Sequence, residues 1–308
     1  MAVVGPTAVG KTAAAIRLAR DLAGEVVSAD SRYLYRGLDI GTAKPSEEEM
    51  AGVPHHLIDV VEPTQDYSLA IYQADAYRTI DRILDRGRLP ILAGGTPLYV
   101  NALLEGWRIP EVPPDPTFRE AMAQVAEDEG PAVLHARLAM VDPLAADRIP
   151  MTNVRRVVRA LEIHRSTGRP MTEIEGKQPP PYDVLTLGLM VPRDELYRRI
   201  DRRIEEQIAG GWIEEVQRLL GAGLSPAVPA MSAIGYREIA DYLAGTCSLA
   251  EASDRIKYHT HRYARHQLTW LKRMPGIHWF DPREPSWYDE MLGLARDFLT
   301  RSQASRPN

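Results

Sequence analysis

Cysteine is almost missing from this chain, whose 308 residues include only Cys247. One thiol cannot form an internal disulfide, and it excludes a zinc site built from several cysteines. No run approaches the roughly twenty consecutive apolar residues that a membrane-spanning helix needs. The first dozen residues already form a motif, so they do not read as a secretory signal peptide. We therefore expect a cytoplasmic protein without a membrane anchor.

An excess of positive charge is also missing, because the net charge is -5. This balance argues weakly against nucleic-acid binding, but the distribution of charge is uneven. Six arginines between Arg148 and Arg169 accompany a single acid, Glu162, and six basic residues from Arg255 to Arg273 accompany none. Such runs are most often solvated helix faces. The missing counter-charges, and the histidines and aromatic residues interleaved with the second run, favour contact with a polyanion.

The sequence "GPTAVGKT" at residues 5–12 fits the phosphate-loop pattern G-x-x-x-x-G-K-[ST]. Its backbone N–H groups and its lysine cradle a chain of phosphates. Most such loops bind ATP for phosphoryl transfer, but the contacts of the loop recognise a chain of phosphates and not one particular nucleotide. The rest of the chain has to identify the ligand.

The elements around this loop predict an α/β doubly wound parallel sheet. Residues 2–4 form a short apolar strand, and residues 11–24 are periodic as a helix that we expect Gly24 to cap. Further apolar runs occupy 25–31 and 88–96, and each ends in polar or glycine residues. A periodic helix, closed by Gly87, lies between them.

Proline-rich stretches mark two boundaries, at 108–116 and 178–182. The segment between them has helical periodicity, so we expect an inserted helical lobe at 113–183 and a core made of 1–112 and 184–308. After a strand at 184–191, apolar residues recur every fourth position from Leu196 to Ile208 along a long helix. Ser248 is a candidate N-cap for a further helix, and 286–303 is helical.

Asp30 is the acidic residue nearest the end of a predicted core strand. Spacing alone leaves three roles open for it, as a metal-organising carboxylate, a general base or a helix cap. The other strand, at 88–96, ends in glycines and Thr96, without the acid that usually holds Mg²⁺ in kinases. A small-metabolite kinase nevertheless remains one interpretation.

Seven segments together carry a more specific signal. They are "GPTAVGKT", "SADSRYLYRGLDIGTAKP", "GVPHHLIDVVEP", "AGGTPLYVNALLEG", "RRVVRALEIHRSTGRP", "AIGYREIADYLAG" and "RYARHQLTWLKR". In this order, from Gly5 to about Lys272, the chain resembles the tRNA dimethylallyltransferases (tRNA isopentenyltransferases). No cysteine-rich zinc module follows, so the bacterial type is favoured.

The resemblance implies transfer of a dimethylallyl group from dimethylallyl diphosphate to N6 of the adenosine 3′ of the anticodon, in tRNAs that read codons beginning with U. It implies Mg²⁺ as the cofactor and tRNA as the partner, and we expect a monomer. Two alternatives stay open, the kinase and an adenylate isopentenyltransferase that differs only in its acceptor.

Site residues follow by similarity, with Asp30 as the proton acceptor and Lys11 and Thr12 at the leaving group. Donor diphosphate contacts are expected from Gly5, Thr7, Ala8, Val9, Gly10, Lys11 and Thr12, with Thr12 also a candidate Mg²⁺ ligand. Arg203 is a further candidate for the diphosphate, although an arginine beside an apolar stripe is more often a surface residue. The tRNA contacts are expected at Asp30, Ser31, Arg32, Tyr33, Thr96, Arg119, Arg155, Arg156, Arg159, Ser232, Gly235, Tyr236, Arg237, Arg265, Gln267, Trp270 and Lys272.

Some positions depart from the family's usual pattern. The first strand, "MAVV", is short, Val9 stands where a small polar residue is common, and Arg155 stands where glutamine is frequent. His55 and His56 are neighbours that point different ways, and the histidines at 259, 261 and 266 have no carboxylate among them. We expect the first two to pack within the structure and the other three to lie on a solvated or RNA-facing helix, and neither group to bind a metal.

Overall fold

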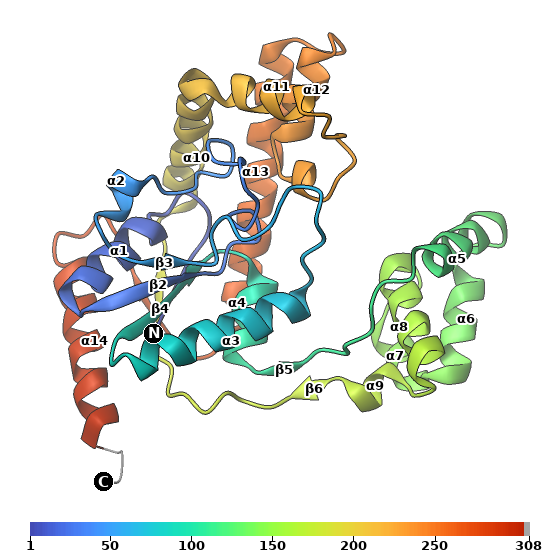
Figure 1. The fold of residues 1–308 in the computed structure, drawn as a ribbon, viewed down its shortest axis with the longest axis horizontal. Coiled ribbons are helices and arrows are strands. Elements are labelled where there is room, and N and C mark those ends of the chain that lie inside the picture. The colour runs from blue at the N-terminus through green and yellow to red at the C-terminus, as the bar shows by residue number, and fades with distance from the viewer. Residues whose placement is uncertain (305–308) are drawn as a thin grey trace. The chain divides into compact units, whose positions relative to one another are not determined.

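The computed structural model describes residues 1–304. They divide into two compact units (Figure 1). The first comprises Met1–Val100 and the chain from Pro181 onward, and the second is Asn101–Pro180. The first unit holds the sheet and the phosphate loop, and the second is mostly helical.

The first unit is built on one parallel sheet of six strands in the order β3-β2-β4-β1-β7-β8. The strands are β1 (Ala2–Val4), β2 (Gly24–Ser28), β3 (His55–His56), β4 (Leu89–Gly94), β7 (Thr186–Leu189) and β8 (Ile277–Phe280). β1 lies in the middle, with Val3 level with Ala93 of β4 and Leu187 of β7. The predicted α/β fold is confirmed.

Two helices connect the first strands, α1 (Lys11–Asp21) and α3 (Leu69–Asp85). The connection through α1 leads from β1 to β2, and the one through α3 leads back from β3 to β4, in the opposite direction across the sheet. Since such crossovers are right-handed, the two helices cover opposite faces. Both faces of the sheet are therefore covered, which explains why the central strands β1, β4 and β7 are mostly apolar.

The prediction that Gly24 caps the first helix was wrong. α1 ends at Asp21, and Gly24 is the first residue of β2. A Cβ atom at Gly24 would lie 2.8 Å from the carbonyl oxygen of Leu89. The glycine therefore permits close pairing of β2 with β4 and does not end the helix.

Helices complete the first unit after β7. They are α10 (Arg193–Gln207), a π-helical turn (Ile208–Trp212), α11 (Ile213–Gly221), a 3₁₀ turn (Ala230–Ser232), α12 (Tyr236–Leu243), α13 (Leu249–Leu271) and α14 (Trp287–Ala304). Two further helices precede β7, α2 (Glu47–Met50) and α4 (Pro97–Leu104), and the last four residues of α4 belong to the second unit. α10 and α13 lie against each other (Figure 1). Of the predicted stripe, Leu196, Ile200 and Ile204 are buried as expected, and Ile208 is half-buried in the π-helical turn. Ser248 caps α13 by accepting a hydrogen bond from the Glu251 N–H.

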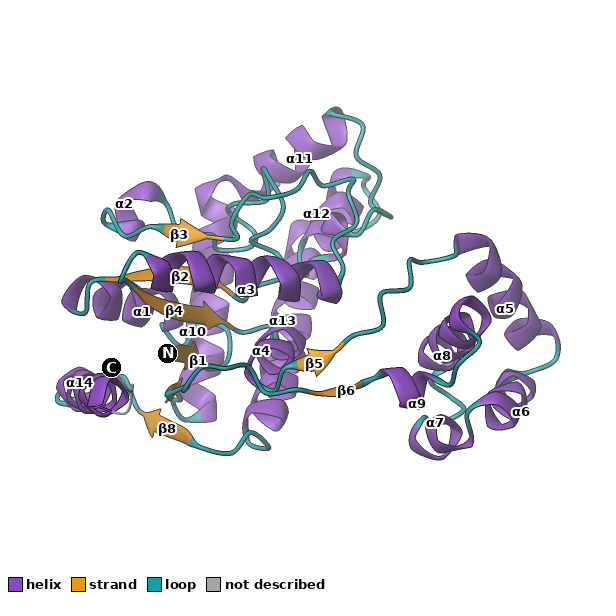
Figure 2. Ribbon diagram, turned by 60° about the horizontal axis from the view of Figure 1, so that its bottom comes forward, coloured by secondary structure: helices purple, strands orange, loops and turns teal. Residues whose placement is uncertain are grey.

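The second unit packs helices around its own apolar core (Figure 2). Its elements are β5 (Trp107–Arg108), α5 (Pro116–Asp128), α6 (Pro131–Val141), α7 (Pro143–Arg148), α8 (Val154–Thr167), α9 (Met171–Ile174) and β6 (Gly176–Lys177). β5 and β6 pair antiparallel where the chain enters and leaves the unit. The core includes Leu134, Leu138, Ile149 and Val157. Across residues 1–304, no helix is long and apolar enough to cross a membrane.

Candidate active site

The phosphate loop joins β1 to α1 and depends on two glycines. A Cβ atom at Gly5 would lie 2.6 Å from the carbonyl oxygen of Leu189. Gly10 has φ of 100° at the start of α1, a left-handed conformation that favours glycine. The loop thus leads straight into the amino-terminal end of an eleven-residue helix. The free backbone N–H groups there favour an anion, and phosphates are frequent ligands at such ends.

Lys11 bends back over this loop. Its ammonium Nζ donates a hydrogen bond of 2.7 Å to the carbonyl oxygen of Pro6. Burial lowers the pKa of Lys11 to about 8; the nearby Asp30 charge opposes this shift and Arg203 adds to it. A negatively charged group bound beside Lys11 would favour its charged form and so hold the proton on the ammonium.

Arg203 of α10 reaches the same loop from the other side. Its guanidinium Nη2 donates to the Thr7 hydroxyl at 2.7 Å. The Nε atom of Arg203 is buried and has no hydrogen-bond partner among residues 1–304. A buried N–H without a partner is costly, so this guanidinium favours an incoming anion. The side chain points inward, in contrast to the surface role that arginines beside an apolar stripe more often have.

Asp30 follows β2 at the carboxyl edge of the sheet. Its Oδ1 accepts a hydrogen bond of 2.9 Å from the Arg32 N–H, and no partner for Oδ2 is found in the described part of the chain. Residues 31–34 form turns and no helix begins there, so Asp30 is not a helix cap. The turn fixes the carboxylate and leaves one oxygen available for a substrate or a cation.

Two cavities meet at this carboxylate. The first, of about 430 Å³, is lined by the phosphate loop, including Lys11 and Thr12. The second, of about 350 Å³, is lined by polar residues that include Ser31 and Thr96. Both cavities are lined by Thr7, Asp30, Thr42 and Arg203. The site therefore has one end at the phosphate loop and a second end lined by Ser31 and Thr96, with Asp30 and Arg203 at the junction.

Gln267 of α13 supports the phosphate loop. Its Oε1 accepts a hydrogen bond of 2.9 Å from the Thr7 N–H, and its Nε2 donates to the Gly95 carbonyl at 2.6 Å. Only 2% of the residue is exposed. Both ends of this amide are thus used within the protein. The resemblance places Gln267 at the tRNA, but the sequence carries no signal for this contact with the loop.

A buried carboxylate that the sequence analysis missed holds the loop at residues 39–42. Glu215 of α11 is 4% exposed and accepts hydrogen bonds from the N–H groups of Asp39 and Ile40, each at 2.8 Å, and from the Tyr236 hydroxyl at 2.7 Å. Two causes raise the pKa of Tyr236: the larger is burial of its hydroxyl, and the second is the negative charge of Glu215. Glu215 thereby fixes the loop that carries Thr42, which lines both cavities.

The predicted tRNA contacts fall into three groups. The first lines the two cavities: Asp30, Ser31, Arg32, Tyr33, Thr96 and Ser232. The second group, Gly235, Tyr236, Arg237 and Gln267, lines neither cavity, and its three side chains form hydrogen bonds within the protein. Gly235 has φ of 101° and begins α12, where the Trp212 ring leaves no room for a side chain. The third, Arg265, Trp270 and Lys272, is exposed on the last turns of α13 and just beyond them.

The remaining predicted contacts are arginines of the helical unit, and the structure separates them. Arg119 and Arg159 bind Glu162, whose side chain is 2% exposed, at 2.8 Å and 2.5 Å. Burial alone would raise the pKa of Glu162, but hydrogen bonds from Arg119, the Asp115 N–H and Arg159 outweigh it and lower the pKa to about 2. Arg155 and Arg156 are exposed, with no carboxylate within ion-pair distance in residues 1–304. These two side chains are therefore available to bind an anion from outside the protein.

A magnesium ion fits the end at the phosphate loop. Thr12, Asp30 and Glu49, whose side chains carry oxygen atoms, line the loop cavity. No cluster of three metal-binding side chains occurs in residues 1–304. The two carboxylates and the hydroxyl fit Mg²⁺, which usually keeps several waters and binds through one or two carboxylates and the substrate's phosphates. The histidines have other partners, since His56 binds Glu25 and His259 binds Glu238, each at 2.7 Å.

Comparison with known proteins identifies the family. A family model described as IPP transferase matches residues 33–274. The chain is 62% identical over 291 residues to a tRNA dimethylallyltransferase of Thermomicrobium roseum, covering 94% of this chain and 88% of the relative. The chain belongs to the tRNA dimethylallyltransferase family. A relative of the same name from a Roseiflexus species is 52% identical, covering 90% of this chain and 91% of the relative.

Solved structures agree with this assignment. A tRNA isopentenylpyrophosphate transferase of Bacillus halodurans has a TM-score of 0.71 and 42% identity, with 97% of this chain and 94% of that chain covered. A eukaryotic dimethylallyltransferase acting on tRNA has a TM-score of 0.82 and 26% identity, covering 99% and 79%. The match to the family model begins after the phosphate loop and Asp30. The roles of these residues therefore rest on the geometry of the site.

Proposed function

We propose that this chain transfers the dimethylallyl group of dimethylallyl diphosphate to N6 of the adenosine 3′-adjacent to the anticodon, in tRNAs that read codons starting with U. The observation that carries this proposal is the meeting of the two cavities at Asp30 and Arg203. The diphosphate would occupy the end at the phosphate loop (the phosphate end), and the adenine the end lined by Ser31 and Thr96 (the acceptor end). The reacting carbon and nitrogen then lie at the junction.

The phosphate end suits a leaving diphosphate. In the reaction the bond between the allylic carbon and the diphosphate oxygen breaks, so negative charge grows on the leaving group. The helix α1 N–H groups, Lys11 and Arg203 are fixed donors for that charge before the reaction begins. Such preorganised donors stabilise a transition state without rearranging. A bound Mg²⁺ near Thr12 would supply further positive charge at the diphosphate.

The acceptor end suits a nitrogen that loses a proton. The exocyclic amine of adenine is a weak nucleophile because its lone pair is delocalised into the ring. As the new bond between N6 and carbon forms, one N6 proton passes to the free Oδ2 of Asp30. The hydrogen bond from Arg32 to Oδ1 keeps the carboxylate oriented for this transfer.

Of the alternative functions, a kinase would use the same loop with ATP. The family assignment supports the prenyl donor instead. An adenylate isopentenyltransferase would need neither the helical unit nor unpaired basic residues. The exposed Arg155, Arg156, Arg265 and Lys272 without carboxylate partners in residues 1–304 support a polyanionic RNA acceptor.

Competition for the loop tests the donor assignment. Labelled dimethylallyl diphosphate is bound to the protein with Mg²⁺, and inorganic diphosphate or ATP is then added as competitor. We expect tight binding of the label, displacement by diphosphate, and loss of binding in Lys11→Ala. Tight binding of ATP together with failure to retain dimethylallyl diphosphate would favour the kinase.

A further inference from the structure

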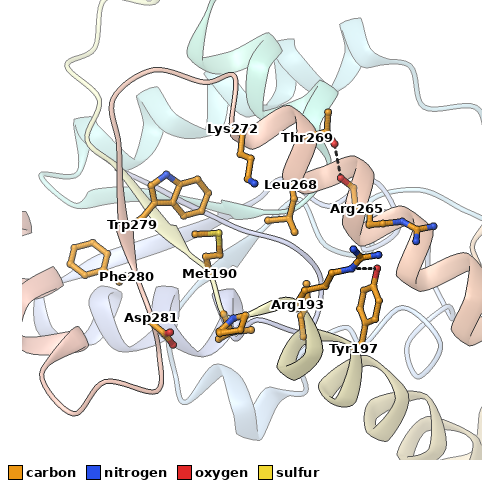
Figure 3. Close-up of a pocket in the computed structure, with 13 residues that line it drawn as sticks. Met190, Arg193, Tyr197, Arg265, Leu268, Thr269, Lys272, Trp279, Phe280 and Asp281 are labelled. Atoms are coloured by element: carbon orange, nitrogen blue, oxygen red, sulfur yellow. Dashed lines mark hydrogen bonds between the residues drawn. The ribbon is translucent and has the colours of Figure 1, made fainter.

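A third hollow, separate from the two cavities of the active site, lies at the carboxyl ends of β7 and β8. Its volume is about 700 Å³, and the start of α10 and the end of α13 complete its wall. In Figure 3 the side chains of Met190, Lys272 and Trp279 surround one space, with Arg193 and Arg265 on the helical side. The hollow combines apolar surface with three basic side chains.

The helix α13 separates this hollow from the active site. Arg265, Leu268 and Lys272 line the hollow at positions i, i+3 and i+7, which share one helix face. Gln267 lies on another face and binds the phosphate loop at Thr7. No residue that lines the hollow lines either cavity of the active site. A ligand in the hollow would therefore lie beside the reacting groups and not among them.

The basic residues of α13 differ between its two halves. In the first half, Arg255 and Lys257 bind Asp241 and Glu205 at 3.6 and 2.6 Å. In the second, Arg265 and Lys272 are exposed, and no carboxylate in residues 1–304 lies within ion-pair distance of either. The positive charges of Arg265 and Lys272, which line the hollow, are thus not neutralised by a neighbouring carboxylate in the described residues.

The other charged groups of the hollow do not cancel this charge. Arg193 lies over the Tyr197 ring, with its Nε donating to the Tyr197 hydroxyl at 3.1 Å. Asp281 also lines the hollow, but Arg283 binds it at 2.6 Å. The hollow is therefore net positive and favours an anion.

The apolar part of the hollow favours a flat ligand. The half-buried Trp279 indole offers an aromatic face, and Met190, which is 36% exposed, and Leu268 extend the apolar surface. Bases that are not paired in a helix bind proteins by stacking on such side chains, with their phosphates on arginine and lysine. The ligand that matches both features is a nucleotide.

We propose that this hollow binds one unpaired nucleotide of the acceptor RNA, other than the adenosine that is modified. Its base stacks on Trp279, and Arg265 and Lys272 hold the adjoining phosphate. RNA is favoured over a free mononucleotide because the exposed, unpaired cations continue beyond the hollow, at Arg262 and Arg273. The proposal rests on the proposed function, which supplies the RNA.

An abasic scan of the RNA tests this inference. Each unpaired nucleotide of an anticodon stem-loop is made abasic in turn, except the modified adenosine, and the dissociation constant is measured for the wild type and for Trp279→Leu. For the wild type, one abasic position should weaken binding about 5- to 100-fold. In Trp279→Leu that position should cost less than about twofold. Tyr258→Leu, an exposed aromatic residue of α13 outside the hollow, should behave as the wild type.

Two further measurements keep the outcome decisive. If Trp279→Leu does not fold, Arg265→Ala and Lys272→Ala replace exposed side chains, and each should remove the effect of a methylphosphonate at the same nucleotide. Equal sensitivity of wild type and variants at every position would overturn the proposal. So would saturable binding of adenosine monophosphate or dimethylallyl diphosphate that only Trp279→Leu abolishes. Failure of the proposed function itself would appear differently, as absence of prenyl transfer to an RNA that binds normally.

Discussion

The Oε1 atom of Gln267 accepts a hydrogen bond from the backbone N–H of Thr7 at 2.9 Å, which joins the last turns of α13 to the phosphate loop across 260 residues of sequence. The same side chain donates to the carbonyl oxygen of Gly95, after β4. The helix that carries the unpaired basic residues is therefore attached directly to the loop that would bind the donor.

Replacing Gln267 should loosen the loop. Gln267→Leu removes both hydrogen bonds, which leaves the half-buried Thr7 N–H without this partner and the Gly95 carbonyl with only the Tyr263 hydroxyl at 3.4 Å. The cost should be about 1–3 kcal/mol in total. We expect the dissociation constant for dimethylallyl diphosphate to rise about tenfold or more. His266→Ala, which changes an exposed neighbour, is the matched control and should bind the donor normally. Unchanged donor affinity in Gln267→Leu would show that the loop does not depend on this contact.

A substitution can remove the proposed proton-accepting role of Asp30 while keeping the hydrogen bond that orders its turn. Asn in place of Asp30 keeps an oxygen that accepts the hydrogen bond from Arg32, but it cannot take a proton at neutral pH. Loss of a general base typically slows a reaction about 10²- to 10⁴-fold. Asp30→Asn should show this loss in single-turnover transfer, with donor and tRNA affinity within a few fold of the wild type. A wild-type rate would rule out proton transfer to Asp30.

Donor binding should weaken above neutral pH because the pKa of Lys11 is lowered to about 8. Below this pH the free lysine is charged and ready for the diphosphate. Above it, binding must first return a proton to the lysine, so the affinity should fall up to about tenfold for each pH unit. Titration of donor affinity from pH 7 to 10 measures this slope. Lys11→Ala should bind weakly with a flatter profile, and a flat wild-type profile would contradict the assignment.

The arginines of the helical unit should divide by their partners. Arg155 and Arg156 are exposed and unpaired in the described chain, so Arg155→Ala with Arg156→Ala should weaken tRNA binding and flatten its salt dependence. The slope of log K against log salt should fall by roughly 0.7–0.9 for each phosphate that the variant no longer neutralises. The melting temperature should stay the same. An unaltered slope would remove this helix face from the RNA interface.

Glu162, in contrast to the exposed arginines, should affect the stability of the helical unit. Glu162→Gln breaks the buried contacts with Arg119 and Arg159 and should cost about 3–5 kcal/mol of the free energy of unfolding. Its folded pKa of about 2 lies below the ordinary value of about 4.3. The stabilisation is thus complete above that ordinary value and is lost as the pH falls toward 2. In urea unfolding from pH 7 to pH 3, the difference in the free energy of unfolding between wild type and Glu162→Gln should narrow as the pH falls below about 4, and a constant difference would contradict this.

The sequence predicts the local features of the fold well. The phosphate loop, the buried strands, the stripe of Leu196 and Ile200, and the Ser248 cap follow from patterns of a few residues. The prediction for Gly24 was wrong because a glycine after a helix can end that helix or begin a strand that packs closely. Only the distance to Leu89 distinguishes the two.

The long-range contacts of the site could not be predicted in this way. Gln267 meets Thr7, Glu215 meets residues 39–41, and Arg203 meets Thr7, each across more than 170 residues of sequence. No pattern within one helix distinguishes these side chains from others on the same helix. Resemblance to the family predicts which residues contact the donor and the tRNA, but it does not reveal which of them form hydrogen bonds within the protein.

The product of the complete reaction tests the proposed function most directly. The protein is incubated with dimethylallyl diphosphate, Mg²⁺ and unmodified tRNA, and the tRNA is digested for nucleoside mass analysis and fragment sequencing. We predict that adenosine gains one dimethylallyl group on N6, at the position 3′ of the anticodon, and that Asp30→Asn forms this product far more slowly. Unmodified tRNA after exhaustive incubation, with phosphoryl transfer from ATP or prenylation of free adenosine monophosphate instead, would contradict it.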